Sequence, residues 1–436
     1  MTLLDEHRLA DGRKEADALI EEARQRQRRR RLLVGSIVLV VALASGIWAA
    51  SGGGSAIKPP STSKKPGHTK TPASTPGSAK KGTTTSATWP FGPWVLAIAF
   101  TTANTGFASV ASDCGTLRCY VDIEATVNGG ATWHQVARLA RPVQPPQSRN
   151  DLWFANPEDG VLFDADSSVV LITHDGGRKW SPVRVPGVVI QAFSLGRDFV
   201  LVADECSPAT PGSPDCGPGE LVMVPLGADV VAAVHRLPSC AASWAGDVVS
   251  AGTTLLALGC DRLFRSENGG AKWKGIRVSF PWSSPLLAAD GPSDIWVMDT
   301  FGSGGGSQWK SIYRSLNGGK TWHLAGRASA GAPMLGPSVG NLPHPGYAFM
   351  VIATSAQHVL VLSDSFGVSA SFDGGRLWVS PPVARYGSEA GGMACVGSED
   401  CWAALVDPFP HGGSVILRTR NGGRTWFATL RMGRQP

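Results

Sequence analysis

From about residue 89 onward, short apolar runs alternate with polar turns that contain glycine. Examples are GVLF at 160–163, DIWVM at 294–298 and SVVLITHDGG at 168–177. Within these runs apolar and polar side chains alternate with a period of two, as they do in antiparallel strands. No part of this region has a long helical period. The region 89–436 is therefore predicted to be all-β.

One turn pattern, [S/T]-x-[D/N]-G-G-x-x-W, recurs through the region. Its six copies begin at Thr126, Thr173, Ser266, Ser315, Ser371 and Thr419, at intervals of 47, 93, 49, 56 and 48 residues. The interval of 93 residues equals two units of about 46, and such a period is typical of propellers and other repeat arrays. One unit, roughly 188–238, thus has strands but has lost the motif, and its turn is the degenerate LGAD at 226–229.

Each unit contains three apolar strands, the third running into the motif, and a short fourth strand after the tryptophan. Four strands per unit, repeated radially, form a β-propeller. The region 89–436 holds 348 residues, which gives seven units at a period of about 50. Six motif units and one unit without the motif also make seven, so we predict a seven-bladed β-propeller.

The chemistry of the motif indicates a structural role. Asn-Gly and Asp-Gly tolerate the positive φ of tight turns, and the Asn or Asp side chain accepts hydrogen bonds from the turn. The tryptophan then lies at the start of the fourth strand, where a large apolar side chain can pack between neighbouring blades. Four of the six copies carry Asn, which disfavours a catalytic or metal-binding carboxylate. The residues assigned this structural role are Asn128, Trp133, Asp175, Trp180, Asn268, Trp273, Asn317, Trp322, Asp373, Trp378, Asn421 and Trp426.

This motif resembles the Asp box, S-x-D-x-G-x-T-W, of the bacterial neuraminidase repeat. The Gly-Gly form, with unit openings such as FANPEDGVLF (154–163), is also similar to the photosystem II assembly and stability factors. The resemblance implies a propeller of Asp-box blades. It implies little about activity, because such propellers include sialidases, xyloglucanases and sorting receptors.

The first fifty residues predict a membrane anchor. Residues 32–50 form an uncharged run of nineteen residues, and six arginines stand in the segment 24–31 before it. A run of this length spans a bilayer as a helix, and the arginines place the N-terminus in the cytoplasm and the propeller outside. Residues 1–31 are predicted to form a charged cytoplasmic helix. The alternative is a cleaved signal peptide, since Ala42-Leu43-Ala44 fits an A-x-A cleavage site.

Residues 51–88 are rich in Ser, Thr, Pro, Gly and Lys and predict a disordered linker. They hold six lysines and no acids, whereas the region from 89 onward holds 25 basic and 27 acidic residues, a net charge of −2. A nearly neutral propeller disfavours nucleic acid as a partner.

All eight cysteines follow the apolar run. An even number in an extracytoplasmic β-domain predicts disulfides, although the sequence leaves the connectivity open. Neighbours in the sequence are the simplest pairs: Cys114 with Cys119, Cys206 with Cys216, Cys240 with Cys260, and Cys395 with Cys401. A metal site would instead need C-x-x-C spacing and nearby histidines, which do not occur.

Two hydrolase patterns would indicate an enzymatic role. A sialidase needs an arginine cluster for the substrate carboxylate, a Tyr–Glu nucleophile pair and an Asp that acts as the acid/base. Such enzymes usually also carry an [F/Y]-R-I-P stretch, which is absent from this sequence. Tyr120 and Glu124 are near each other, but both precede a motif copy. A xyloglucanase-like enzyme needs two opposed acids. Acids that follow apolar strands are Asp164, Asp166, Asp204, Glu205, Asp299 and Asp364, and no pair among them stands out. The nine histidines are dispersed, so neither a catalytic metal nor a cofactor is predicted.

We therefore expect a single-pass membrane protein whose extracytoplasmic propeller is a non-catalytic binding or assembly scaffold for a protein or glycan. The alternative is a glycoside hydrolase of the sialidase or xyloglucanase type. The segment GSGGGSQW (302–309) predicts a glycine-rich loop at the rim, in which Trp309 is a candidate aromatic contact; the alternative, which we favour, is a tolerated loop without a binding role.

Overall fold

The computed structural model describes residues 93–113, 119–143, 150–164, 167–204, 219–238, 248–259, 261–280, 282, 284–304, 307–329, 336–343, 346–364, 367–383, 389–406 and 413–432. They all belong to one compact unit, Thr83–Pro436. The predicted cytoplasmic segment, membrane helix and linker lie outside these residues. Among the residues described, none forms a helix of the length and apolarity that a membrane span requires.

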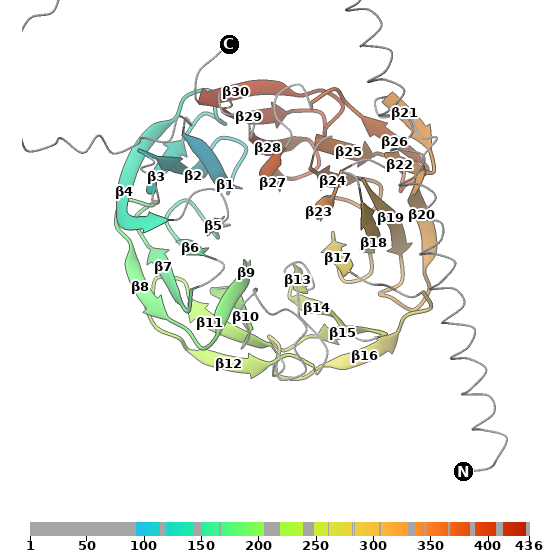
Figure 1. The fold of residues 1–436 in the computed structure, drawn as a ribbon. Helices are drawn as coiled ribbons and strands as arrows, with labels where there is room; N and C mark the ends of the chain where they lie inside the picture. Colours follow the sequence, from blue (N-terminus) through green and yellow to red (C-terminus); the bar gives the residue numbers. More distant parts are fainter. Residues whose placement is uncertain are drawn as a thin grey trace, which may run out of the picture. The chain divides into compact units, whose positions relative to one another are not determined.

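Seven sheets stand around a central axis and form a seven-bladed β-propeller, as predicted (Figure 1). Blade 1 contains β1 (Trp94–Phe100), β2 (Gly106–Ser112), β3 (Cys119–Thr126) and β4 (His134–Val143), and blade 2 contains β5 (Asn150–Phe154), β6 (Gly160–Asp164), β7 (Val169–Thr173) and β8 (Ser181–Arg184). Blade 3 contains β9 (Val188–Leu195), β10 (Asp198–Asp204), β11 (Glu220–Pro225) and β12 (Ala233–Arg236), and blade 4 contains β13 (Val248–Ala251), β14 (Thr254–Gly259), β15 (Arg262–Ser266) and β16 (Lys274–Arg277). Blade 5 contains β17 (Ser284–Ala289), β18 (Ile295–Gly304), β19 (Ser307–Ser315) and β20 (His323–Ser329). Blade 6 contains β23 (Ala348–Ala353), β24 (Val359–Ser363), β25 (Gly367–Ser371) and β26 (Leu377–Ser380), and blade 7 contains β27 (Glu389–Val396), β28 (Asp400–Val406), β29 (Ser414–Thr419) and β30 (Phe427–Met432).

Each blade is an antiparallel meander whose strands follow the chain order, with the first strand nearest the axis and the fourth at the outside (Figure 1). The unit without the motif is blade 3, in which β9 to β12 span 188–236. Although this unit has lost the motif, it keeps its apolar alternation, and its four strands pair as in the other blades.

The long interval between the fifth and sixth blades has a structural cause. The connection between them carries two extra strands, β21 (Gly336–Val339) and β22 (Asn341–Pro343). β22 pairs in parallel with β20 of blade 5, whereas β21 pairs with β26 of blade 6. The connection thus joins the outer edges of two neighbouring blades, which accounts for the motif interval of 56 residues in place of 47–49.

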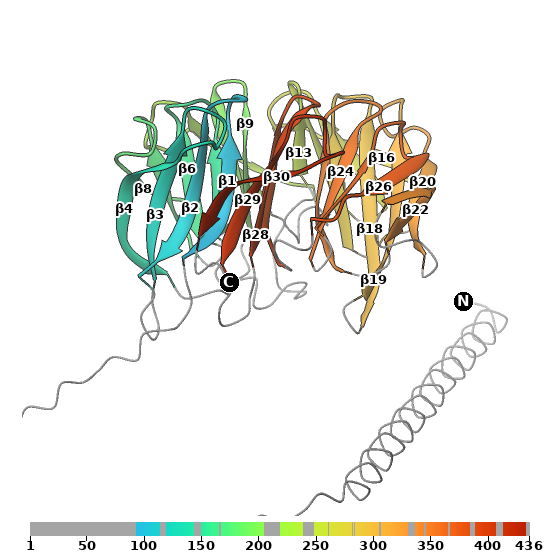
Figure 2. The same cartoon turned by 90° about the horizontal axis from the view of Figure 1, so that it is seen from above.

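The two faces of the ring carry different connections. First-to-second and third-to-fourth connections of every blade, including the motif turns, lie on one face, which we call the motif face. The second strand of each blade ends, and the third begins, on the opposite face, which we call the connector face (Figure 2). The β18–β19 hairpin extends beyond the neighbouring strands on the connector face (Figure 2).

Candidate functional site

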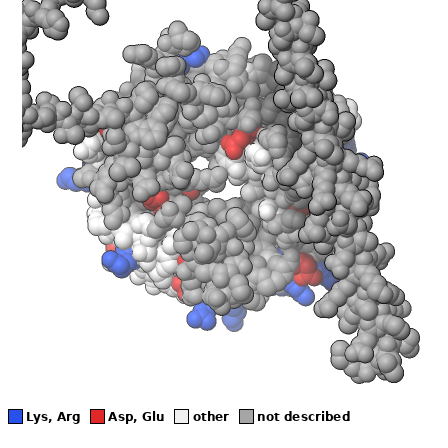
Figure 3. All heavy atoms as spheres, in the orientation of Figure 1, with Lys and Arg blue, Asp and Glu red and all other residues white. Residues whose placement is uncertain are grey.

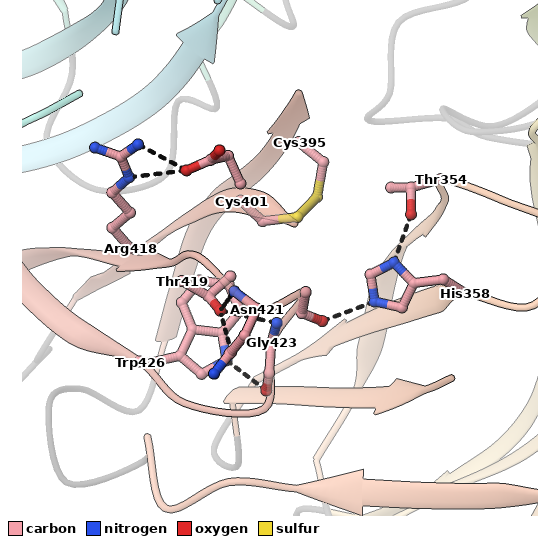
Figure 4. Close-up of a disulfide and its surroundings, with 11 residues drawn as sticks. Thr354, His358, Cys395, Cys401, Arg418, Thr419, Asn421, Gly423 and Trp426 are labelled. Atoms are coloured by element: carbon pink, nitrogen blue, oxygen red, sulfur yellow. Dashed lines mark hydrogen bonds and ion pairs between the residues drawn. A yellow bond between two sulfur atoms is a disulfide. The ribbon is translucent and has the colours of Figure 1, made fainter. Parts of the chain in front are cut away.

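The motif turns are closed hydrogen-bonded units. In the last copy, the Thr419 hydroxyl accepts a hydrogen bond from the Gly423 amide at 2.9 Å and donates to Asn421 Oδ1 at 2.9 Å (Figure 4). Asn421 Oδ1 also accepts from the Thr425 amide at 3.0 Å. The Ser or Thr hydroxyl takes the amide of the second glycine in all six copies, at 2.8–3.0 Å. The polar side chains of the motif are thus used within their own turns.

The two Asp copies bond in the same way. Partial burial raises the pKa of Asp175, but hydrogen bonds from the Lys179 amide, the Thr173 hydroxyl and the Arg178 amide outweigh it. The pKa of Asp175 therefore lies below its ordinary value. This carboxylate is an ionised acceptor of the turn and not a group poised to donate a proton.

The motif tryptophans fill the seams between blades. Six of the seven seams have an apolar cluster that includes the motif tryptophan of the following blade, and Trp426, for example, packs with Leu360, Leu362 and Leu417 between blades 6 and 7. The tryptophans of the other five are Trp133, Trp180, Trp273, Trp322 and Trp378. The second motif glycine packs at the same place, since a Cβ on Gly270 would lie 2.6 Å from Leu221 of the preceding blade.

The seam between blades 2 and 3 is different, because blade 3 has no motif. The apolar cluster described at that seam contains valines, phenylalanines and leucines but no tryptophan. His174, from the motif turn of blade 2, lies here between two carboxylates. Its Nδ1 is 2.6 Å from Asp159 Oδ1, and its Nε2 is 3.1 Å from Asp229 Oδ1 in the turn of blade 3. Asp159 Oδ1 also accepts from the Gly227 amide at 3.2 Å.

Sequence reasoning did not find this cluster. The signal was present, since His174 is the variable residue of one motif copy and Asp229 belongs to the degenerate turn LGAD. The two residues are 55 positions apart, however, and only the ring arrangement brings them together.

The candidate acids lie at equivalent places in separate blades. Asp164 and Asp204 end the second strands of blades 2 and 3, Asp299 lies in that of blade 5, and Asp364 directly follows that of blade 6. Asp299 is buried, and its Oδ1 accepts from the Ser284 amide at 3.3 Å. Asp166 and Glu205 lie outside the described residues. The four described acids, Asp164, Asp204, Asp299 and Asp364, come from four different blades, at the connector-face half of their second strands. In Figure 3, Lys and Arg lie along the periphery of the ring, whereas Asp and Glu also reach the central opening.

Tyr120 and Glu124 do not form a nucleophile pair in the described structure. Both lie on one face of β3, but Asp122 stands between them and binds Arg138, with 2.7 Å from Nε to Oδ1. The Arg138 guanidinium lies 5.5 Å from the centre of the Tyr120 ring. Burial, and then the nearby Asp122, raise the pKa of Glu124. The cluster joins β3 to the outer strand β4.

Cys395 and Cys401 form a disulfide across the β27–β28 hairpin (Figure 4). Cys119 is also disulfide-bonded. The remaining predicted cysteines, Cys114, Cys206, Cys216, Cys240 and Cys260, lie outside the described residues. Among the residues described, no group of three or more His, Cys, Asp or Glu side chains has an arrangement that could hold a metal ion.

The segment 302–309 differs from the predicted loop. β18 runs to Gly304 and β19 begins at Ser307, so most of the segment is a paired hairpin. Its strands pair Ser303 with Gln308 and Gly304 with Ser307 after a register shift beyond Phe301. The prediction of a loop was wrong because glycines accommodate such an irregularity within paired strands.

This hairpin presents two aromatic side chains. Phe301 and Trp309 are direct cross-strand partners, and 42% and 45% of their surfaces are exposed. Cross-strand partners project from the same face of a sheet, and here that face is the one that packs against blade 4. Further along it, the Tyr313 ring stacks on Phe280 of the blade 4–5 connection, with 3.7 Å between ring centres. The cross-strand pair of Asp299 and Ser311 lies on this face between Tyr313 and the aromatic pair at the end of the hairpin.

No family model matches the sequence, and no curated protein matches it. Among solved structures, the chain is similar to YCF48 bound to D1 peptide, with 15% identity, a TM-score of 0.47, and coverage of 72% of this chain and 91% of that one. It is similar to YCF48 from Cyanidioschyzon merolae at 16% identity, with a TM-score of 0.48 and coverage of 78% and 98%. An ancestral GH74 enzyme has 11% identity, a TM-score of 0.39 and coverage of 78% and 62%. Identities of this size imply no common partner or activity, and the assignment of the propeller rests on its sheet topology.

Proposed function

We propose that the protein is a membrane-anchored, extracytoplasmic propeller that acts as a non-catalytic scaffold and binds a protein partner through the β18–β19 hairpin. The membrane anchor is supported by the sequence of residues 24–50. The observation that supports the binding role is the exposed pair of Phe301 and Trp309 on a hairpin that extends beyond the other strands. Large aromatic side chains are enriched among the residues that dominate binding energy at protein interfaces.

The strand register favours a protein over a glycan. β17 pairs with β18 only as far as Thr300, and β20 pairs with β19 only from Ser311 onward. The outer part of the hairpin, beyond these two residues, is therefore a two-stranded ribbon within the described structure. An extended peptide can add as a strand along the β18 edge of this ribbon, beyond Thr300, while its side chains contact the aromatic pair.

The test is recovery of the partner from membranes with the full-length protein and two variants. The double variant Phe301→Ser with Trp309→Ser should lose the captured partner, because it removes the aromatic contact and leaves the propeller core intact. Leu316→Ala is the matched control, since Leu316 is 55% exposed but belongs to a motif turn on the opposite face. Equal capture by all three proteins would contradict the proposal.

The hydrolase alternative makes a separate prediction. Under it, the purified protein would release sugar from a polysaccharide, and Asp299→Asn or another acid-to-amide change on the connector face would abolish this release. Turnover that responds to these changes and not to the aromatic double variant would favour a glycoside hydrolase over the scaffold.

A further inference from the structure

The seam between blades 2 and 3 lacks the contacts that close the other six. In each of those seams the tryptophan and the second glycine of a motif turn pack against the preceding blade. Blade 3 supplies neither, because its third-to-fourth connection is the short turn around Gly227. On the motif face of this seam, Ala155, Leu226 and Val231 pack against the apolar cluster, and the polar contacts centre on His174.

The geometry around His174 requires two donors. Both ring nitrogens face carboxylate oxygens, Nδ1 at 2.6 Å from Asp159 and Nε2 at 3.1 Å from Asp229. An ionised carboxylate only accepts hydrogen bonds, and a neutral imidazole has one N–H, so only the imidazolium satisfies both contacts. Loss of the proton leaves a ring lone pair directed at one of the two carboxylates. The contact of His174 with Asp159 or the one with Asp229 must then separate or take up a water molecule.

We propose that Asp159, His174 and Asp229 form a pH-dependent latch that closes the seam between blades 2 and 3 when His174 is protonated and releases it when His174 loses its proton. The latch joins three connections on the motif face: β5–β6, β7–β8 and β11–β12. It goes beyond the proposed scaffold function and does not depend on the identity of the partner.

The charges around the latch favour the protonated state. Partial burial alone lowers the pKa of His174, but the hydrogen bonds to Asp159 and Asp229 outweigh it and raise that pKa above its ordinary value. Partial burial likewise raises the pKa of Asp159, and bonds from Asn156 and His174 outweigh it and lower that pKa. The other charged residues on the elements around His174 are Glu158, Asp175, Arg178, Lys179 and Arg197.

The direction of the pH effect follows from these shifts. The raised pKa of His174 makes the latch fully effective below the ordinary histidine value of 6.5, and its contribution is lost as pH rises through the folded-state pKa. The lowered pKa of Asp159 sets the acid limit, because the contribution of this carboxylate is lost as pH falls below 3.8 toward its folded-state pKa. The latch is therefore closed in mildly acidic solution and open in alkaline solution.

Hydrogen exchange of the full-length protein tests the latch. The Gly227 amide donates to Asp159, so its protection, corrected for intrinsic exchange, should fall as pH is raised from 5.5 to 8.5. The expected loss is about tenfold for each unit by which the pKa of His174 is raised. His174→Gln, whose side chain does not titrate, should abolish this fall. His134→Gln is the control, since His134 is an exposed histidine that follows another motif tryptophan.

Two results would overturn the latch. The first is a wild-type protein in which the protection of the Gly227 amide does not fall with pH, and the second is a fall of equal size, which we call the step, in His174→Gln. If His174→Gln does not fold, Asp229→Asn provides the second test, because it removes one carboxylate while keeping the shape of the side chain. That variant should shift the step to lower pH. An unchanged step in Asp229→Asn would equally contradict the proposal.

Discussion

Trp402 Nε1 donates a hydrogen bond to the Gly129 carbonyl oxygen at 3.1 Å and thereby joins residues 273 positions apart. The Trp402 ring also stacks on Phe100, with 3.7 Å between ring centres. These residues lie where the last blade meets the first. Every strand of blade 7 comes from the end of the described chain and every strand of blade 1 from its start, so the described sheets close the ring without sharing a strand. Side-chain contacts across this seam therefore hold blade 7 against blade 1.

Arg418 is the charged part of the same closure. It is 5% exposed, pairs with Asp400 at 2.6 Å, and donates to the carbonyl oxygens of Gly129 and Ala103 in blade 1 at 3.1 Å each. Arg418→Ala would leave Asp400 and two carbonyl groups without this donor, at a cost of about 3–5 kcal/mol in the free energy of unfolding. Urea unfolding measures the loss. Arg424→Ala, at an exposed motif position, should cost less than about 1 kcal/mol.

Substitutions of the two adjacent glycines of one motif turn distinguish the cost of backbone strain from the cost of packing. Gly269 and Gly270 both have positive φ, +68° and +92°, but only Gly270 contacts the neighbouring blade. We expect Gly269→Ala to cost about 1–2 kcal/mol, the penalty for a side chain in the left-handed region. Gly270→Ala should cost about 1–3 kcal/mol more, because its Cβ would overlap Leu221. Equal losses in thermal or urea unfolding would refute the packing role of the second glycine.

A single-atom change tests whether the motif carboxylates are structural. Asp373 Oδ1 accepts hydrogen bonds from the amides of Arg376 and Leu377 at 3.0 and 2.9 Å, which an amide oxygen can also accept. Asp373→Asn should therefore leave stability within about 0.5 kcal/mol, as at a neutral surface position. Asp373→Ala should cost about 1 kcal/mol or more. A large loss of stability or partner binding in Asp373→Asn alone would indicate that the charge itself is used.

His358 gives the seam between blades 6 and 7 the opposite pH dependence to His174. Its Nε2 donates to the Gly422 carbonyl at 2.7 Å, and burial lowers the pKa of this histidine (Figure 4). Stability from the neutral ring is present above pH 6.5 and is lost as pH falls from there toward the folded-state pKa. Urea midpoints measured between pH 5 and 8 should fall less steeply on acidification in His358→Gln than in the wild type. Parallel curves would show that His358 does not titrate in this range.

The Cys395–Cys401 disulfide closes a short loop, with a sequence separation of 6. Chain entropy predicts that such a crosslink contributes about 2 kcal/mol. Mass spectrometry of a non-reduced digest should recover the two cysteines in one linked peptide, and Cys395→Ser with Cys401→Ser should lower stability by about that amount. Free thiols at both positions in protein purified without reductant would contradict the assignment.

The number of blades could be predicted from the sequence because the motif is local and periodic. Each turn uses hydrogen bonds within eight residues, so its pattern can be read in the linear sequence, and the doubled interval of 93 residues shows where one unit has lost it. The seam role of residues such as Trp426 also followed from their fixed place after the turn.

The latch and the hairpin could not be predicted in the same way. Asp159, His174 and Asp229 come from different connections, and their contact depends on how two neighbouring blades are placed. The pairing of β21 and β22 with two different blades equally depends on a tertiary arrangement that has no sequence period. The hairpin at 302–309 was misread because glycine-rich composition alone does not distinguish a loop from paired strands.

The central claim is best tested by photocrosslinking from position 309 in intact cells. A photoreactive residue in place of Trp309 should link the full-length protein to one defined partner, with the crosslink on an extended segment of that partner. The same residue in place of Leu316, on the motif face, should not. Capture at 309 that the Phe301→Ser change abolishes is the result that the account predicts. Capture of the same partner from 316 and not from 309 would contradict it.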